Sequence, residues 1–374
     1  MNIYINYSFL FLYQVCFLTQ LYYLLVIQRK FTVYKSNVVT DSQINFPLSV
    51  IICARNEAKN LAQYLPFVLE QDYPDFEVVV VNDCSSDNSE DILRGLQSKY
   101  AHLKVVKIEE HPRYKTAKKF AATLGIKASS NEILVFTDAD CKPESTLWLS
   151  LIASKYQNPA TEIILGYSPY QRFGGILNAL IRFETFHTAL NYFSYALNGM
   201  PYMGVGRNLS YKKSLFFKGK GFASHMHIPS GDDDLFVNQN ATEGNVEIEV
   251  NTNSHTLSIP KQSWKDYWNQ KIRHSGAGNM YKKHHKINLS FQAISAMGFY
   301  VLVIVCLALK VEPIVIGIVF IVRLIAQVYV YYRPMQSLKA KDLIWWFIFL
   351  DPFYYFYLLI LSIASFFKKK VSWK

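Results

Sequence analysis

The stretch Glu132-Ile-Leu-Val-Phe-Thr-Asp-Ala-Asp140 decides the fold, because a run of strand-forming residues leads directly into two carboxylates. An apolar run of this length is typical of a strand buried in a parallel sheet. Carboxylate oxygens are ligands that Mg²⁺ and Mn²⁺ prefer, and these ions complete their coordination with water and nucleotide phosphates. Asp138 and Asp140 are therefore candidate ligands of a divalent cation. The alternative is that they only end the strand and start a loop.

A second run, Phe76-Glu-Val-Val-Val-Val81, also ends in polar residues, because Asn82 and Asp83 follow it directly. The carboxyl ends of parallel strands meet at one edge of an open sheet, and ligands bind in the crevice beyond that edge. Two strands with acidic ends therefore predict one shared pocket. Chemistry on a nucleotide diphosphate is the first hypothesis for that pocket.

The middle of the chain alternates strands with helices. Strands are predicted at 48–53, 76–81, 103–108 and in the run up to Asp138, and helices are predicted after Glu57, at 87–99 and at 116–128. This alternation predicts an α/β fold with a mostly parallel, Rossmann-like sheet covered by helices on both faces. No Gly-x-Gly-x-x-Gly lies between the first strand and the first helix, so a dinucleotide oxidoreductase is poorly supported.

Both ends of the chain are strongly apolar, and the N-terminal end predicts a membrane anchor. Residues 8–27 carry no charge and are long enough to cross a bilayer as a helix, and Arg29 and Lys30 follow closely. The positive-inside rule then places the residues after about 28 in the cytosol. A cleaved signal peptide is the alternative, but no Lys or Arg precedes the apolar run.

Three further apolar stretches, 291–309, 313–332 and 343–367, predict a C-terminal membrane bundle and thus a multi-pass membrane protein. A basic cluster at 282–286 precedes them, so we interpret the net charge of +11 as a membrane-facing surface and expect no nucleic-acid partner. Three simple crossings would leave the lysines at 368–370 outside, against the charge rule. We therefore expect a break at Asp351-Pro352 and a cytosolic carboxyl end.

Two small motifs of the middle region could approach a phosphate. Lys118 lies in the basic segment 115–119, which could place ammonium groups near a diphosphate or form a solvated helix face. The glycines of Gly204-Val-Gly-Arg-Asn208 would let backbone pass close to a sugar or phosphate, but a tight turn explains them equally well.

Two longer motifs could act on a sugar. Gly231-Asp-Asp-Asp-Leu235 places three carboxylates in a row. Like charges this close repel one another and raise the pKa values of the carboxyl groups, as a general base requires. An exposed acidic N-cap of a helix would have the same sequence. Trp264–His274 combines aromatic and cationic residues at helical spacing, which suits a sugar ring and a leaving phosphate. An amphipathic helix at the membrane interface is the alternative.

Taken in this order, the motifs resemble those of the inverting family 2 glycosyltransferases, in the membrane-integrated branch with a cytosolic GT-A catalytic domain. The resemblance covers residues from about 48 to 278. The segment Val50-Ile-Ile-Cys-Ala-Arg-Asn-Glu57 is similar to that family's first strand and turn, which implies that Ala54 and Glu57 contact the nucleotide sugar. Asn82 and Cys84 depart from the family's paired aspartates and glycine, which leaves Asp83 as the base or ribose contact.

The later motifs assign further roles by the same resemblance. Asp138-Ala-Asp140 matches the family's Asp-x-Asp, implying Asp140 on the metal and Asp138 on the nucleotide sugar and the metal site. The acidic run resembles the Glu-Asp motif, whose aspartate is the catalytic base, and either Asp232 or Asp233 fits. The segment Gln270-x-x-Arg273-His274 looks like the family's Gln-x-x-Arg-Trp motif, which implies that Gln270, Arg273 and His274 contact the donor. Lys118 of the basic segment is a further expected donor contact. His274 replaces the usual Trp, which weakens the case for processive synthesis.

The resemblance implies an enzyme of cell-envelope glycan synthesis. Residues 1–30 would be an anchor, 31–290 a cytosolic GT-A domain with a nucleotide-binding half (46–145) and an acceptor half (146–280), and 291–374 a membrane bundle. The expected reaction is the inverting transfer of a hexose-type sugar from a nucleotide-diphosphate donor to a lipid-linked or glycan acceptor, assisted by Mg²⁺ or Mn²⁺. The expected location is the inner or plasma membrane if the source is prokaryotic. The alternatives are a processive polysaccharide synthase and a non-catalytic scaffold that binds nucleotide sugars.

Overall fold

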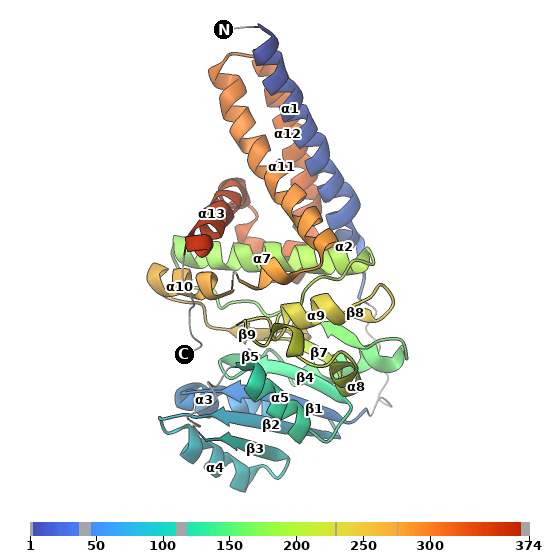
Figure 1. The fold of residues 1–374 in the computed structure, drawn as a ribbon, viewed down its shortest axis with the longest axis vertical. Coiled ribbons are helices and arrows are strands. Elements are labelled where there is room, and N and C mark those ends of the chain that lie inside the picture. The colour runs from blue at the N-terminus through green and yellow to red at the C-terminus, as the bar shows by residue number, and fades with distance from the viewer. Residues whose placement is uncertain (1–2, 37–45, 110–117, 229, 275, 368–374) are drawn as a thin grey trace.

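A seven-stranded sheet organises the α/β part of the chain, as a computed structural model shows (Figure 1). Its strands, in spatial order, are β3 (Leu103–Ile108), β2 (Phe76–Asp83), β1 (Leu48–Ala54), β4 (Ile133–Asp138), β7 (Leu209–Lys212), β6 (Ile163–Leu165) and β8 (Val246–Ile248). The first four are parallel, β7 runs antiparallel to β4 and β6, and β8 is parallel to β6. The predicted mostly parallel sheet is confirmed. The structure describes residues 3–36, 46–109, 118–228, 230–274 and 276–367.

Helices cover both faces of the parallel half of the sheet. One face carries α3 (Ala58–Leu69), α4 (Ser89–Lys99) and α6 (Trp148–Ser154), and the other carries α5 (Lys118–Ala128). Along β1, Val50 and Ile52 face α3 while Ile51 faces α5, because successive side chains of a strand point to opposite faces. The α5 helix lies so close to the sheet that a Cβ at Gly125 would be 2.8 Å from the Ile51 side chain. The expected start of this helix near 116 lies outside the described residues.

The register of the strands brings their polar ends together. Asp138 at the end of β4 is paired with Cys53, and Ala54 at the end of β1 is paired with Asn82. Asp83 and Asp138 therefore lie on either side of the end of β1, at the same edge of the sheet. This is the arrangement that the two acidic strand ends predict.

The remaining elements of the α/β part lie on the side of the sheet that faces the long helices. They comprise β5 (Cys141–Pro143), α7 (Ile176–Leu197), α8 (Lys213–Lys218), α9 (Asp234–Asn240), β9 (Thr256–Ser258) and α10 (Trp264–His274). β5 and β9 form a separate two-stranded antiparallel sheet. Figure 1 shows α7 and α10 lying across the lower end of the helical column.

The helical column is built from the first and the last helices of the described chain. Its elements are α1 (Ile3–Tyr22), a π-helical turn (Tyr23–Gln28), α2 (Arg29–Val33), α11 (Lys283–Ala308) and α12 (Pro313–Ser337), with α13 (Phe347–Phe367) beside them. Four helical segments of the described chain are long and apolar enough to cross a membrane: Tyr4–Val33, Lys283–Ala308, Pro313–Ser337 and Phe347–Ala364. The predicted apolar segments are thus helical, and the basic cluster at 282–286 is mostly the first turn of α11 rather than a separate segment before it.

The expected break at Asp351-Pro352 is wrong, because α13 runs through both residues. Pro352 is the sixth residue of the helix, so it removes one backbone hydrogen bond without ending the helix. The Asp351 carboxylate is buried and pairs with Arg323 of α12 at 3.3 Å, and it also accepts a hydrogen bond from Tyr300. Polar residues within a membrane bundle are satisfied by such partners rather than by a chain break. The lysines at 368–370 lie outside the described residues, so the cytosolic carboxyl end stays a prediction.

A buried asparagine, Asn208, fastens the antiparallel half of the sheet to its surroundings. Its side-chain amide donates to the carbonyls of Tyr167 and Ser254, both at 2.8 Å, and its side-chain oxygen accepts from the Trp148 indole at 3.1 Å. Because Asn208 is 1% exposed, water cannot replace these partners. One side chain therefore links β7 to α6 and to two loops.

We expect Asn208→Leu to lower the thermal midpoint of the protein by about 5 °C or more, because it strands three buried polar groups at roughly 1–3 kcal/mol each. Differential scanning fluorimetry in detergent measures this change. Asn253→Leu, at an exposed asparagine, is the control and should shift the midpoint little. Equal shifts for the two variants would contradict this assignment.

Candidate functional site

The carboxylate at the end of β2 is the most deeply buried of the candidates. Asp83 is 0% exposed, and its pKa is raised by burial, against the opposing charge of Arg55. Asn82 beside it is also buried, and its Oδ1 has no hydrogen-bond partner among the described residues. Ala54, at the end of the neighbouring β1, is buried as well and supplies only backbone. This corner of the sheet edge offers hydrogen-bond acceptors, which suit the donor groups of a base or a ribose.

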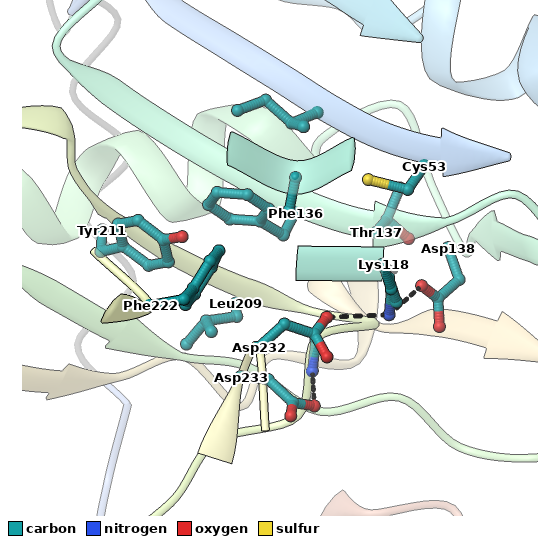
Figure 2. A pocket seen from close by; sticks show the side chains of 13 residues that line it. Cys53, Lys118, Phe136, Thr137, Asp138, Leu209, Tyr211, Phe222, Asp232 and Asp233 are labelled. Atoms are coloured by element: carbon teal, nitrogen blue, oxygen red, sulfur yellow. Dashed lines mark hydrogen bonds and ion pairs between the residues drawn. The ribbon is translucent and has the colours of Figure 1, made fainter. Parts of the chain in front are cut away.

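A single ammonium group joins two of the predicted acidic residues (Figure 2). Lys118, the first residue of α5, places Nζ 3.0 Å from Asp138 Oδ1 and 3.1 Å from Asp232 Oδ2. Burial alone would raise the pKa of Asp138, but the charge of Lys118 outweighs it and the pKa is lowered. Burial opposes the charged form of Lys118 too, yet the two carboxylates hold its pKa well above the usual value. Asp138 and Lys118 are therefore both charged at neutral pH.

The three consecutive aspartates 232–234 at the start of α9 have different partners. Asp233 is the N-cap of α9: it accepts from the backbone N–H of Asp234 at 2.8 Å and from that of Gly206 at 2.7 Å. Asp234 accepts from the Tyr281 hydroxyl at 2.8 Å, and burial together with the charge of Asp233 raises its pKa to about 7. Burial and the charge of Asp232 raise the pKa of Asp233. Only Asp232 directs its carboxylate at Lys118, so the run is neither fully exposed nor merely a cap.

Asp140 lies just beyond the end of β4 and is the carboxylate best placed to take a cation. Burial and the charge of Asp138 raise its pKa, and Glu57 contributes in the same direction. Its Oδ1 accepts only a weak bond from the Cys141 thiol, at 3.6 Å. The described residues include no group of three or more His, Cys, Asp or Glu side chains placed to hold a metal. Protein carboxylates would therefore supply part of a coordination shell, as is usual where substrate phosphates complete it.

The Gly204–Asn208 segment is a tight turn that also delivers an arginine to the site. The backbone N–H of Asn208 donates to the Val205 carbonyl at 3.0 Å, which closes the turn. The Arg207 guanidinium lies over the Tyr170 ring, 4.2 Å from its centroid, within electrostatic reach of Asp138. Its Nη1 is buried and has no hydrogen-bond partner among the described residues. Arg207 was not among the predicted site residues, and an arginine directly after Gly-x-Gly was the only sequence signal for it.

The last turn of α10 reaches the mouth of the site. Arg273 accepts a hydrogen bond at its backbone oxygen from Ser230, at 3.3 Å. The His274 ring lies within electrostatic reach of Asp138, but burial and the charges of Lys271 and Arg273 lower its pKa to about 3, so the ring is neutral at neutral pH. Gln270 is half-buried one turn earlier and makes no hydrogen bond to another candidate among the described residues. The helix predicted at 264–274 is confirmed with these bounds.

The cavity behind Lys118 is small. It has a volume of about 20 Å³ and is lined by both polar and apolar side chains, among them Cys53, Lys118, Thr137, Asp138, Tyr211 and Asp232. This is room for about one water molecule. A nucleotide would therefore lie above the strand ends, with Lys118 and its two carboxylates forming the floor of its site.

Comparison with known proteins agrees with this fold. A family model described as Glycosyl transferase family 2 matches residues 49–208. Glycosyltransferase AglE of Haloferax volcanii is 35% identical over 121 residues, which are 32% of this chain and 38% of the relative. The probable glycosyltransferase YdaM of Bacillus subtilis is 26% identical over 247 residues, 63% of this chain and 55% of the relative. The chain thus matches about half or less of the length of these curated relatives.

One solved structure is similar over nearly the whole chain. The mannosyltransferase PcManGT from Pyrobaculum calidifontis, in complex with GDP-Man and Mn²⁺, superposes with a TM-score of 0.63 and 17% identity over 98% of this chain and 99% of that one. At this identity the likeness establishes the fold, which is of the GT-A type. Residues 49–208, somewhat less than half of the chain, are the part that matches glycosyl transferase family 2.

We expect Lys118→Met to increase the affinity for Mn²⁺ in the absence of nucleotide by about tenfold, or about 1.4 kcal/mol. The ammonium now neutralises Asp138 and Asp232, so a divalent cation must compete with it. Electron paramagnetic resonance of free Mn²⁺ measures the affinity. Lys127→Met, at the exposed end of the same helix, is the control for the loss of one charge. An affinity equal to or weaker than that of the wild type would show that Lys118 does not compete with the cation.

Proposed function

We propose that this protein is a membrane-bound, inverting glycosyltransferase that uses a nucleotide-diphosphate sugar. The observation that carries the proposal is the convergence of Asp138, Asp140 and Asp232 with Lys118 and Arg207 at the carboxyl ends of β1 and β4. Carboxylates at this edge of the sheet suit the binding of a metal ion and the role of a general base. The positively charged side chains of Lys118 and Arg207 suit the binding of a diphosphate. A non-catalytic scaffold would not need the carboxylates of the metal ligand and the general base. Asp138, Asp140 and Asp232 are all present, which favours an enzyme.

In this proposal the donor lies along the strand ends. Asp83 and the backbone at Ala54 and Glu57 meet the nucleoside, and Asp138 meets the nucleotide sugar. Lys118 and Arg207 face the diphosphate, with Arg273 and His274 closing the site from α10. A Mg²⁺ or Mn²⁺ ion held by Asp140 would offset the charge that develops on the departing diphosphate.

The proposed reaction is a single displacement. The acceptor hydroxyl oxygen forms a bond to the anomeric carbon while the bond from that carbon to the diphosphate oxygen breaks, so the anomeric configuration inverts. The hydroxyl proton passes to a carboxylate acting as general base. Asp232 fits this role better than Asp233, because both oxygens of Asp233 already accept backbone hydrogen bonds, while the Asp232 carboxylate is paired with a side chain, the Lys118 ammonium.

The position of the site relative to the long helices supports a membrane-associated acceptor. The α7 and α10 helices lie between the sheet and the lower end of the helical column (Figure 1), and α10 brings Arg273 close to the segment that carries Asp232. Arg29 and Lys30 follow the first apolar helix, which favours a cytosolic catalytic domain between a membrane anchor at 1–30 and a membrane bundle from 291. We therefore propose a lipid-linked or glycan acceptor that enters along the cytosolic membrane surface.

Two substitutions should separate donor binding from transfer. We expect Asp140→Asn to abolish metal-dependent binding of the donor, and Asp232→Asn to leave the donor Kd within about threefold while it lowers kcat by roughly 10²-fold or more, as the loss of a general base does. Calorimetry with UDP-, GDP- and dTDP-sugars, with Mn²⁺ or chelator, measures binding. Release of nucleotide in the presence of a total lipid extract measures turnover.

Asp91→Asn, at an exposed aspartate of α4, is the matched control and should change neither quantity. If Asp233→Asn abolishes turnover while Asp232→Asn does not, the base is Asp233 instead. Metal-dependent donor binding that survives Asp140→Asn would overturn the assignment of the cation ligand. No binding of any donor to the wild type would count against the proposed function itself.

A further inference from the structure

A buried carboxylate on α7 holds the helix that closes the candidate site. Glu184 Oε2 accepts from the Lys271 ammonium at 2.7 Å and also from the Tyr267 hydroxyl. Both donors belong to α10 and are four residues apart, so they lie on the same face of that helix. The Glu184 side chain is 8% exposed, and a carboxylate in such surroundings depends on its partners for stabilisation.

The α10 helix buries little of its own surface within the described part of the chain. It has 11 residues, a length at which an isolated helix is only marginally stable in water. Only Tyr267 and Ile272 are buried, while most of its other side chains are polar and at least partly exposed. Its place and orientation therefore depend on the side chains that meet Tyr267, Lys271 and Ile272.

The α10 helix also packs against α13, the last apolar helix. The Tyr267 ring stacks on Tyr357 of α13, with ring centroids 5.8 Å apart and an interplanar angle of 15°, and Trp268 meets the same ring edge-on. Leu361 of α13 joins Ile272 in the same apolar cluster. The α10 helix is thus held between α7, through Glu184, and α13, through Tyr357.

The residues that Glu184 holds are adjacent in sequence to those that reach the candidate site. Lys271 lies two residues before Arg273 and three before His274. The Arg273 carbonyl accepts from Ser230, two residues before Asp232. A displacement of α10 would move Arg273 and His274 relative to Asp138 and Asp232 without altering those carboxylates.

We propose that Glu184 is a positioning residue for sugar transfer: its bonds to Tyr267 and Lys271 set the placement of α10 over the site. This inference rests on the proposed function. It assigns Glu184 no contact with the substrate, and it makes the geometry of the site depend on the packing of α13, one of the four apolar helices.

The chain offers a matched control in the Lys155–Glu249 pair. Lys155 Nζ lies 3.3 Å from Glu249 Oε2, and the two side chains are 10% and 2% exposed, compared with 22% and 8% for Lys271 and Glu184. Neither residue lines the cavity behind Lys118. Lys155→Met therefore removes the cation of a comparably buried ion pair without touching α10.

The experiment uses the full chain in detergent and compares Glu184→Gln, Lys271→Met, the double variant, Lys271→Arg and Lys155→Met. Nucleotide release with the preferred donor and a total lipid extract gives kcat and KM, and calorimetry gives the donor Kd. We expect Glu184→Gln and Lys271→Met each to lower kcat about tenfold with the donor Kd changed less than threefold. The double variant should be no worse than the worse single variant, because the two act as one unit.

We expect Lys271→Arg to retain most of kcat, and Lys155→Met to lower the thermal midpoint without lowering kcat. A kcat for Glu184→Gln equal to that of the wild type, or a loss matched by Lys155→Met at the same thermal shift, would overturn the proposal. Hydrogen exchange of the α10 amides without donor is the second readout. Glu184→Gln should speed exchange in residues 264–274 and leave α9 unchanged, and unchanged exchange in α10 would also overturn it.

The two proposals fail in distinguishable ways. A wild-type protein that neither binds nor turns over any donor contradicts the proposed function, and the exchange measurement still decides whether Glu184 holds α10. A wild-type protein that turns over donor normally and is unaffected by Glu184→Gln contradicts the positioning role alone.

Discussion

The contact of Lys118 with Asp138 and Asp232 is the interaction on which the candidate site depends. Asp138 ends a strand of the parallel half of the sheet and Asp232 precedes α9, so the two carboxylates come from opposite halves of the α/β part. Partly buried carboxylates this close together would repel each other without a shared cation. One ammonium therefore offsets the repulsion between the two carboxylates and holds the two sides of the site together. A donor's phosphates and the cation bound to them would bring new charges to the same place.

A small number of side-chain contacts also links the site to the apolar helices. The α7 helix packs under the column and supplies Glu184 to α10, and α13 supplies the ring on which Tyr267 stacks. The elements that close the site are thus shared between the sheet and the helical column. A short polar helix held from two sides can keep its place without a large buried area of its own. In this arrangement the packing of α13 and the geometry of the site are coupled through a few side chains.

Much of the fold could be predicted from the sequence because its signals are local. The strands around β1, β2 and β4 are continuous apolar runs, and α10 has helical spacing and clear ends, so their bounds agree closely with the structure. The partners of Lys118, the approach of Arg207 and the role of Glu184 depend on which elements meet in space, and no local pattern encodes that. The expectation for α13 failed for the same reason: Asp351-Pro352 is typical of a break when seen alone, but Arg323, distant in sequence, neutralises Asp351 within the bundle.

The central claim is that Asp138, Asp140 and Asp232 form one site for a cation and a nucleotide diphosphate. Anomalous diffraction at the manganese edge, from crystals grown with Mn²⁺ and a nucleoside diphosphate, tests it most directly. We expect one strong peak within about 2.1 Å of an Asp140 oxygen, the distance of a hard cation to an oxygen ligand, with the diphosphate beside it and Lys118 in contact with a phosphate. A manganese peak elsewhere on the chain, or a nucleotide bound away from the ends of β1 and β4, would contradict it.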